Sequence, residues 1–138
     1  YGDPVVALEK VPRQNVSKYG IIDGFQLDKN TWEIKNFVEK PTAEEAPSDL
    51  AAVGRYIITP EIINILKTQE PGKDGEIRLA DAFSSHLSAG KPIYGCQFDG
   101  KRYDCGDKLQ FVIAQIEMGL EHPEMNEGLR EYLKRFNI

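Results

Sequence analysis

Short apolar runs and helically spaced apolar stripes alternate along this 138-residue chain, separated by clusters of proline, glycine and polar turn residues. Brief apolar runs or strict alternation predict β-strands, whereas apolar residues at helical spacing predict amphipathic helices. The expected strands span residues 5–8, 20–27, 32–40, 51–58, 92–98 and 101–104. The expected helices span about 60–68, 79–89, 107–121 and 127–136. This order, with hairpins set among helices, indicates one mixed α/β domain rather than a clean βαβ alternation.

Turn and capping residues mark the ends of these elements. Residues 28–31 (Asp-Lys-Asn-Thr) are expected to join two strands as a hairpin, and residues 99–100 (Asp-Gly) to turn a second one. Residues 59–61 (Thr-Pro-Glu) suit a helix start because they offer a hydroxyl N-cap, a proline at the first position and an acid facing the macrodipole. Asp107, with Gln110 three positions later, resembles a capping box.

Composition is that of an ordinary globular domain. The chain carries 17 Lys and Arg against 22 Asp and Glu, a formal net charge of −5, with 41% apolar and 28% charged residues. A domain of roughly 150 residues buries about 68–70% of the surface that its unfolded chain exposes, so its core needs no disulfide or metal. The mild acidic excess, without a stripe of basic residues, argues against a nucleic-acid partner.

The apolar runs are far shorter than the roughly 18 residues of a membrane-spanning helix, so no membrane association is expected. Two cysteines, Cys96 and Cys105, are too few for a disulfide framework, and we predict a cytoplasmic protein. The chain opens on Tyr1 rather than methionine and leads almost directly into a strand, so we expect that it was cut from something longer.

An acid and a base stand side by side where a predicted strand ends, in Phe-Val-Glu-Lys-Pro at 37–41. Ligand contacts in α/β enzymes gather at strand ends, and a strand ended by proline twists, so Glu39 and Lys40 could both reach one cleft. The alternative, two solvated charges at a strand terminus, is favoured by the local sequence alone. Gly20, at the start of another strand and beside Tyr19, would let a ligand approach the backbone, but this signal is weak by itself.

A second candidate is Tyr-Asp-Cys-Gly-Asp at 103–107, where Asp104 and Asp107 straddle a glycine before a predicted helix. Mg²⁺ takes one or two carboxylates and keeps its other positions for water and phosphate, and a helix N-terminus also suits phosphate. We favour a plain N-cap role for Asp107, whereas Asp104 has no evident structural role. His86 and His122 lie far apart in the sequence and are interpreted as surface or helix-end residues, not metal ligands.

These and neighbouring segments occur in a specific order: Val-Pro-Arg with Val-Ser-Lys-Tyr-Gly-Ile-Ile-Asp-Gly, then Val-Glu-Lys-Pro, Val-Gly-Arg-Tyr-Ile-Ile-Thr-Pro-Glu-Ile, Gly-Glu-Ile-Arg-Leu-Ala-Asp-Ala and Gly-Lys-Arg-Tyr-Asp-Cys-Gly-Asp. In this order and register they closely resemble bacterial UTP–glucose-1-phosphate uridylyltransferase, also called UDP-glucose pyrophosphorylase. The resemblance covers nearly the whole chain. It implies a Rossmann-like nucleotide-diphospho-sugar transferase fold with a mixed β-sheet.

By this resemblance, residues 1–138 correspond to the C-terminal, sugar-phosphate-binding part of a nucleotidyltransferase domain. The family's N-terminal nucleotide-binding part, with its glycine-rich loop ending in Thr-Arg and an early Asp that binds metal, is expected to be absent. We therefore expect the 138-residue chain alone to be inactive as a uridylyltransferase. In the full-length protein, the implied reaction converts UTP and glucose 1-phosphate into UDP-glucose and pyrophosphate, and the protein is expected to be a homo-oligomer.

The resemblance also implies roles for single residues. Lys40 would act in catalysis by holding the phosphate of glucose 1-phosphate, and Glu39 would accept hydrogen bonds from glucose hydroxyls. Gly20, beside Tyr19, would offer backbone contacts to the sugar, and Asp104 would be a ligand of Mg²⁺. The sugar pocket would also be lined by Ala52 and Val53.

Two other interpretations stay open. A related sugar-nucleotide pyrophosphorylase of the thymidylyltransferase type shares the Glu-Lys-Pro and Asp-x-Gly elements, and a non-catalytic sugar-phosphate-binding or dimerisation module would keep the fold. Ala80 stands where the family pattern has Thr, and residues 75–82 are interpreted as a helix start rather than the edge of a site. The apolar stripe of the last helix is expected to pack on the core rather than on a neighbouring molecule; it contains Leu129, Tyr132, Leu133 and Phe136.

Overall fold

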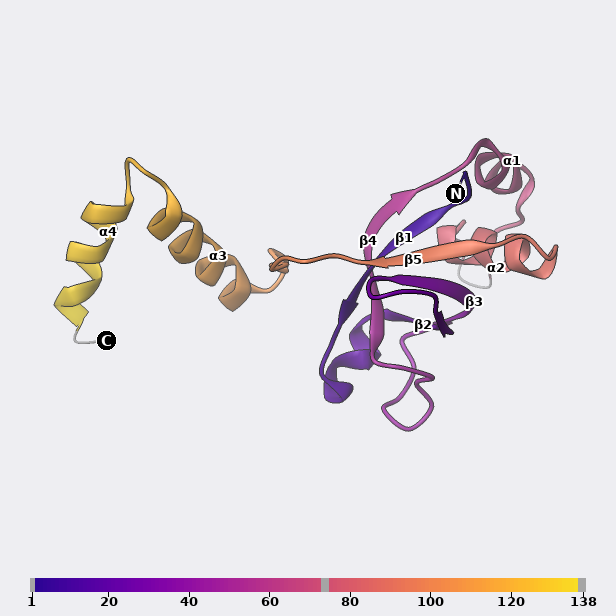
Figure 1. The fold of residues 1–138 in the computed structure, drawn as a ribbon, viewed down its shortest axis with the longest axis horizontal. Helices are drawn as coiled ribbons and strands as arrows, with labels where there is room; N and C mark the ends of the chain where they lie inside the picture. The colour runs from indigo at the N-terminus through magenta and orange to yellow at the C-terminus, as the bar shows by residue number, and fades with distance from the viewer. Residues whose placement is uncertain (1, 73–74, 137–138) are drawn as a thin grey trace. The chain divides into compact units, whose positions relative to one another are not determined.

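The computed structural model describes residues 2–72 and 75–136 (Figure 1). The chain divides into two compact units, Tyr1–Phe98 and Asp99–Ile138. In the described residues, the first unit holds the β-sheet and two α-helices, and the second holds two α-helices that follow an irregular segment. No helix in the described ranges combines the length and the apolar character that crossing a bilayer requires.

The described part of the first unit contains five strands, which close on themselves in the order β1-β4-β2-β3-β5. Their bounds are β1 Val5–Lys10, β2 Gly20–Gln26, β3 Thr31–Glu39, β4 Leu50–Ile57 and β5 Ile93–Gln97. β1 and β5 run parallel, while the other neighbouring pairs are antiparallel. The mixed sheet predicted from the sequence is therefore confirmed, and these strands lie close to their expected bounds.

The predicted second hairpin at residues 99–100 is wrong. Residues 101–104 form no strand, and the chain after β5 is irregular up to the turn before the next helix. β5 pairs along one edge with β1 and along its other edge with β3, so it has no free edge to accept a returning strand. The Asp-Gly pair therefore leads out of the sheet.

Apolar side chains form two clusters that strand alternation keeps apart. Ile21 and Ile22 are neighbours in β2 but enter different clusters, and so do Leu50 and Ala51 in β4. Burying one such large side chain contributes about 1.5–3 kcal/mol. The larger cluster includes residues of helices α1 (Pro60–Thr68) and α2 (Leu79–Ser88) and contains Val6, Leu8, Ile22, Ile34, Leu50, Ile62, Ala82, Phe83 and Ile93.

The two helices of the first unit begin where the sequence predicts. Pro60 occupies the start of α1, but the expected cap is wrong, because the Thr59 hydroxyl makes no capping hydrogen bond and is buried without a partner among the described residues. In α2, Ala82 and Phe83 of the predicted stripe are buried. His86, predicted at the surface or a helix end, lies in the last turn of α2 and is buried there, with neither ring nitrogen hydrogen-bonded within the described ranges.

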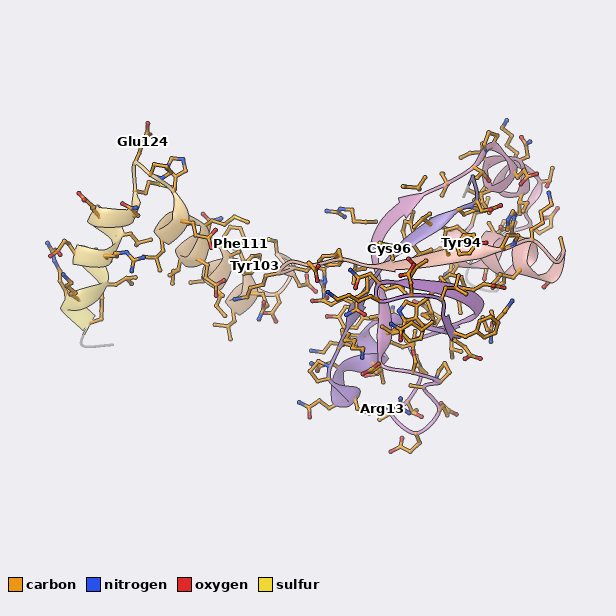
Figure 2. The ribbon with its side chains drawn as sticks, in the orientation of Figure 1. Arg13, Tyr94, Cys96, Tyr103, Phe111 and Glu124 are labelled. Atoms are coloured by element: carbon orange, nitrogen blue, oxygen red, sulfur yellow. The ribbon has the colours of Figure 1, made fainter. Side chains whose placement is uncertain are left out.

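The smaller cluster lies beside a 3₁₀ helix that the sequence does not predict, η1 (Arg13–Lys18), whose first residue is labelled in Figure 2. It joins η1 and β2 to the loop at residues 41–49, which follows β3. Its buried members are Val11, Val16, Ile21, Ala46 and Ala51. This cluster gives the loop after β3 an apolar anchor of its own.

The helices described in the second unit are α3 (Lys108–Glu121), α4 (Asn126–Leu133) and the short 3₁₀ helix η2 (Lys134–Phe136). Asp107 is the N-cap of α3, as predicted, since its Oδ1 accepts the Gln110 backbone N–H at 2.9 Å. α4 packs closely on α3, because a Cβ added at Gly119 would lie 2.8 Å from Leu129 Cδ2. The stripe of the last helix thus contacts α3 through Leu129, although α4 has no buried residue.

Candidate functional site

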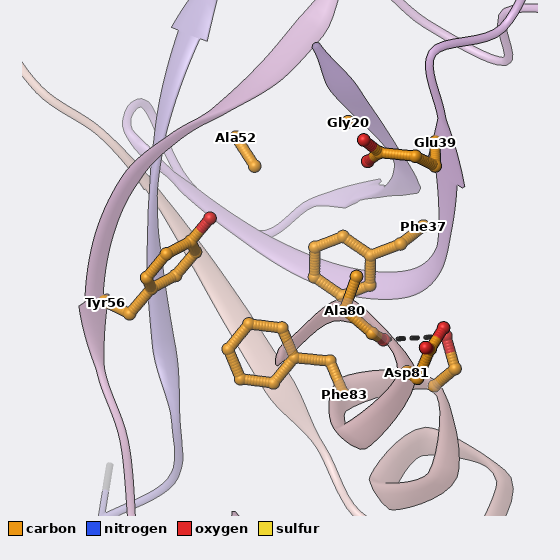
Figure 3. Close-up of a pocket in the computed structure, with 9 residues that line it drawn as sticks. Gly20, Phe37, Glu39, Ala52, Tyr56, Ala80, Asp81 and Phe83 are labelled. Atoms are coloured by element: carbon orange, nitrogen blue, oxygen red, sulfur yellow. Dashed lines mark hydrogen bonds between the residues drawn. The ribbon is translucent and has the colours of Figure 1, made fainter. Parts of the chain in front are cut away.

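A pocket of about 130 Å³ lies in the first unit, between strand ends and the start of α2 (Figure 3). Its lining residues come from β2, β3, β4 and α2: Gly20, Phe37, Glu39, Ala52, Tyr56, Ala80, Asp81, Phe83 and Ser84. Three residues expected at the site, Gly20, Glu39 and Ala52, are thus brought together from three strands. Tyr19, Lys40 and Val53 are neighbours of these residues in the chain but do not belong to the lining.

Strand pairing places Gly20 against Glu39. The two residues are direct partners in the antiparallel β2–β3 ladder, and Ile21 pairs with Ala51 of β4, next to Ala52. A Cβ added at Gly20 would lie 3.1 Å from Glu39 Oε2, so the carboxylate rests directly over the glycine. A side chain at Gly20 would take the space that this carboxylate now occupies.

Lys40 has a left-handed backbone conformation, with φ 46°. Such a conformation costs a non-glycine residue on the order of 1–3 kcal/mol and persists where the surroundings enforce it. Here the Lys40 N–H donates to the Tyr19 carbonyl at 3.0 Å, and the next residue, Pro41, is buried. Consecutive strand side chains normally point to opposite faces, but Lys40 Nζ lies 3.9 Å from Glu39 Oε1. The base and the acid therefore stay on the same side of the strand end.

Aromatic rings form one wall of the pocket. Phe37 and Phe83 are stacked with centroids 5.4 Å apart, and the Tyr56 ring lies 5.6 Å from that of Phe83. Burial, and then the nearby negative charge of Glu39, raise the pKa of the Tyr56 phenol above its ordinary value. Tyr56 therefore keeps its proton at neutral pH and can donate a hydrogen bond. The pocket combines apolar faces with a few polar groups, as small-molecule sites do.

Sequence reasoning missed several of the lining residues. Asp81 lies in the first turn of α2, so the predicted helix start at residues 75–82 is confirmed in part, by α2 beginning at Leu79. The same turn also edges the pocket, which was the alternative interpretation of that segment. Ser84 donates its hydroxyl to the Ala80 carbonyl at 3.0 Å (Figure 3). An acid in the first turn of a helix complements the macrodipole, so the sequence carries no separate signal that Asp81 borders the pocket.

Asp104 belongs to the second unit and has a structural role, contrary to the expectation from sequence. Its Oδ1 accepts the Gly106 N–H at 3.0 Å, and its carbonyl accepts the Asp107 N–H at 3.0 Å. A Cβ at Gly106 would lie 3.2 Å from Asp104 Oδ1, so the glycine leaves room for this turn. The carboxylate thus shapes the turn that precedes α3.

Among the described residues, no three His, Cys, Asp or Glu side chains gather as a metal site. Mg²⁺ is commonly held by one or two carboxylates together with substrate phosphates and water, rather than by a cage of protein ligands. One exposed carboxylate such as Asp104 fits a shared site of that kind, and it does not fit a metal held by this chain alone.

Comparison with known proteins agrees with this arrangement of strands and helices. The family model described as Nucleotidyl transferase matches residues 3–118, so the chain belongs to the nucleotidyl transferase family. The predicted α/β fold with a mixed sheet is thereby confirmed.

More particularly, the chain is a homologue of UTP–glucose-1-phosphate uridylyltransferases. It is 44% identical over 137 residues to the enzyme of that name from Staphylococcus haemolyticus, and the match covers 99% of this chain and 47% of the relative. A crystal structure of UDP-glucose pyrophosphorylase complexed with UDP-glucose is 44% identical, with a TM-score of 0.78 over 87% of this chain and 45% of that one. A UTP-bound enzyme from Acinetobacter baumannii is 31% identical, with a TM-score of 0.83 over 95% of this chain and 45% of that one. The chain spans about half the length of the curated relatives it matches.

Proposed function

We propose that this chain forms the sugar-phosphate side of a uridylyltransferase that makes UDP-glucose and pyrophosphate from UTP and glucose 1-phosphate. The observation that carries this proposal is the pocket in which Glu39 and Gly20 face aromatic walls, with the left-handed Lys40 beside them. Homology supports the choice of substrates, because relatives carry this enzyme's name and related structures hold UTP or UDP-glucose. In this proposal the chain corresponds to the C-terminal part of the relatives.

The pocket suits a hexose. The Glu39 carboxylate accepts hydrogen bonds from glucose hydroxyls, and the backbone of Gly20, beside Tyr19, offers further polar contacts. Phe37 and Phe83 give the sugar ring an apolar surface, as aromatic walls do in small-molecule sites. Additional polar groups come from Tyr56 and Asp81, and strand β4 contributes Ala52 to the pocket wall, with Val53 as the next residue of that strand.

Lys40 is proposed to hold the phosphate of glucose 1-phosphate. A phosphate oxygen of that substrate attacks the α-phosphorus of UTP, the new P–O bond forms, and the bond to the leaving pyrophosphate breaks in line with it. The protein mainly aligns two anions and offsets their repulsion, which an ammonium beside the sugar site can do. When bound, Mg²⁺ would neutralise further phosphate charge, and Asp104 would be the carboxylate that this chain offers to it.

Titration of the 138-residue chain with glucose 1-phosphate tests the proposal. We expect saturable binding that Lys40→Ala weakens about 10- to 100-fold, since a hydrogen bond to a charged group contributes roughly 1.5–3 kcal/mol. Lys29→Ala is the matched control, because it removes the same charge from the turn at the opposite end of the β2–β3 hairpin. Absence of saturable binding, or equal affinities for the two variants, would contradict the proposal and favour a module that only mediates assembly.

A further inference from the structure

A single arginine fastens the loop that follows Lys40. Arg13, labelled in Figure 2, donates from Nε to the Ala43 carbonyl at 2.8 Å, from one terminal nitrogen to the Ser48 carbonyl at 3.0 Å, and from the other to the Ala46 carbonyl at 2.6 Å. Each nitrogen of the guanidinium is thus engaged with backbone of the 41–49 loop. The planar guanidinium binds three loop carbonyls that would otherwise hydrogen-bond to water.

The same loop is fixed at both of its ends. Thr42 and Glu45 form a reciprocal pair, in which the Thr42 hydroxyl donates to Glu45 Oε2 at 2.9 Å and accepts the Glu45 N–H at 3.3 Å. Ser48 donates its hydroxyl to the Ile22 carbonyl at 2.6 Å and accepts the Leu50 N–H at 3.1 Å. The loop therefore has one conformation set by side-chain hydrogen bonds, with Arg13 at its centre.

Arg13 and Lys40 are connected through short, defined contacts. Arg13 begins η1, and Tyr19 follows the end of η1, where its N–H donates to the Val16 carbonyl at 3.1 Å. The Tyr19 carbonyl in turn accepts the Lys40 N–H at 3.0 Å. Val16 and Ala46 are both buried in the cluster between η1 and the loop. Arg13 thus ties together the two segments that meet at the Tyr19–Lys40 hydrogen bond.

We propose that Arg13 is a positioning residue, which holds the 41–49 loop against η1 and thereby keeps Lys40 in its left-handed conformation with its ammonium beside Glu39. This inference rests on the proposed function, in which Lys40 binds the sugar phosphate. A left-handed conformation at a residue before proline needs surroundings that enforce it, and the loop supplies them. Arg13 is not assigned as a phosphate ligand, because its three nitrogens already donate to carbonyls.

The experiment compares the affinities of the 138-residue chain for glucose 1-phosphate and for glucose. The ratio of the two affinities isolates the contribution of the phosphate. We expect Arg13→Ala to lower this ratio about tenfold, toward the value of Lys40→Met, and we expect added millimolar guanidinium to restore it in Arg13→Ala but not in Lys40→Met. Lys29→Ala, which removes a charge elsewhere, should leave the ratio unchanged.

Arg13→Lys provides a second variant if Arg13→Ala does not fold. It keeps the charge, but one ammonium cannot reproduce a fork to three carbonyls, so the ratio should still fall. Amide hydrogen exchange at Lys40 should become faster in both variants, since its bond to Tyr19 would open more often. A purely structural role would lower stability and leave the ratio as in the wild type.

The outcomes separate this inference from the function on which it rests. A wild-type preference for glucose 1-phosphate that falls in the Arg13 variants, with faster exchange at Lys40, supports the inference. A wild-type preference that persists in folded Arg13 variants overturns it and leaves the proposed function intact. A wild-type chain without any such preference overturns the proposed phosphate role of Lys40, and with it this inference.

Discussion

Two acids are proposed to serve the reaction, Glu39 and Asp104, and the segments that carry them, called here the two acidic segments, are held by different kinds of structure. Glu39 ends a strand whose last four residues pair in register with β2, and the ring of Phe37, two residues earlier, stacks on buried Phe83. Asp104 lies in an irregular segment before α3. That segment is attached by polar contacts at the surface, because exposed Lys101 and half-buried Tyr103 both donate to the carboxylate of Glu117.

This difference shows which part of the proposed site owes its geometry to the apolar core. Glu39 is held by a sheet ladder over buried apolar side chains. The stabilisation that this ladder provides changes little with solvent conditions. Exposed ion pairs contribute only about 0–1 kcal/mol and weaken with salt and with pH. The sugar pocket should therefore be formed before ligand arrives, whereas the segment that carries Asp104 should respond to solution conditions.

The largest expected effect comes from removing the core beneath the pocket. Phe83→Ala should lower the free energy of unfolding of the first unit by about 3–5 kcal/mol, because it leaves a cavity where a buried ring packs on Phe37. It should also weaken glucose 1-phosphate binding. Trp32, the single tryptophan of the chain, packs against the same core, so its fluorescence during urea unfolding measures the loss.

The matched control is Phe25→Ala. Phe25 lies in β2 of the same unit but is 52% exposed, so the same truncation should cost less than about 1 kcal/mol. Similar losses for the two variants would contradict the view that the pocket stands on the core.

Much of the fold could be predicted from the sequence because its signals are local. Strands β2 and β3 are indicated by the turn cluster between them, and the start of α3 by Asp107 with Gln110 three positions later, the pair that forms the N-cap hydrogen bond. The return strand at 101–104 could not be excluded in this way. Whether β5 has a free edge depends on its pairing with β1 and β3, and those strands lie far away in sequence.

Candidate residues of the site could be proposed from the sequence where they belong to a motif, and not where only packing brings them to the pocket. Glu39, Lys40 and Gly20 are singled out by the order of the motifs taken together, because a charged strand end or a glycine at a strand entry is a weak signal by itself. Tyr56 and Asp81 do not, since a strand aromatic and a helix-start acid each have an ordinary explanation. The left-handed backbone of Lys40 is likewise invisible in the sequence, because lysine has no preference for it.

A smaller effect, confined to binding, is expected from Gly20→Ala. The added Cβ would meet Glu39 Oε2 at 3.1 Å, so the flexible carboxylate must move, while the strand itself can accept alanine. We expect glucose 1-phosphate affinity to fall about tenfold, equivalent to about 1.4 kcal/mol, with little change in the urea midpoint. Unchanged affinity in calorimetric titration would show that the position of Glu39 does not matter for the sugar.

In the second unit, the same glycine-to-alanine substitution should be stabilising. Gly128 lies within α4, and nothing stands within 4 Å of a Cβ placed there. Gly128→Ala should therefore stabilise the helix by about 1 kcal/mol, the difference in helix propensity between the two residues. Thermal melting followed by circular dichroism at a helical wavelength measures the gain, and a lower melting temperature would contradict the open surroundings described here.

The smallest expected effect, and the sharpest test of the contrast, is the response of the 101–104 segment to pH. Hydrogen bonds from Lys101 and then from Tyr103 hold the pKa of Glu117 below its ordinary value of 4.5. An acid with a lowered pKa in the folded state stabilises that state above about pH 4.5, and the contribution is lost as pH falls through the lowered pKa. Amide hydrogen exchange in residues 101–104 should therefore accelerate, after correction for intrinsic rates, as the solution is acidified below about pH 4.5.

Glu117→Gln should show the loosened segment already at neutral pH, whereas Glu131→Gln, which removes an exposed pair with Lys134 within the last helical segment, should behave as the wild type. Exchange in β3 around Glu39 should not change over the same pH range, and a parallel change there would mean that the two acidic segments are not held differently after all.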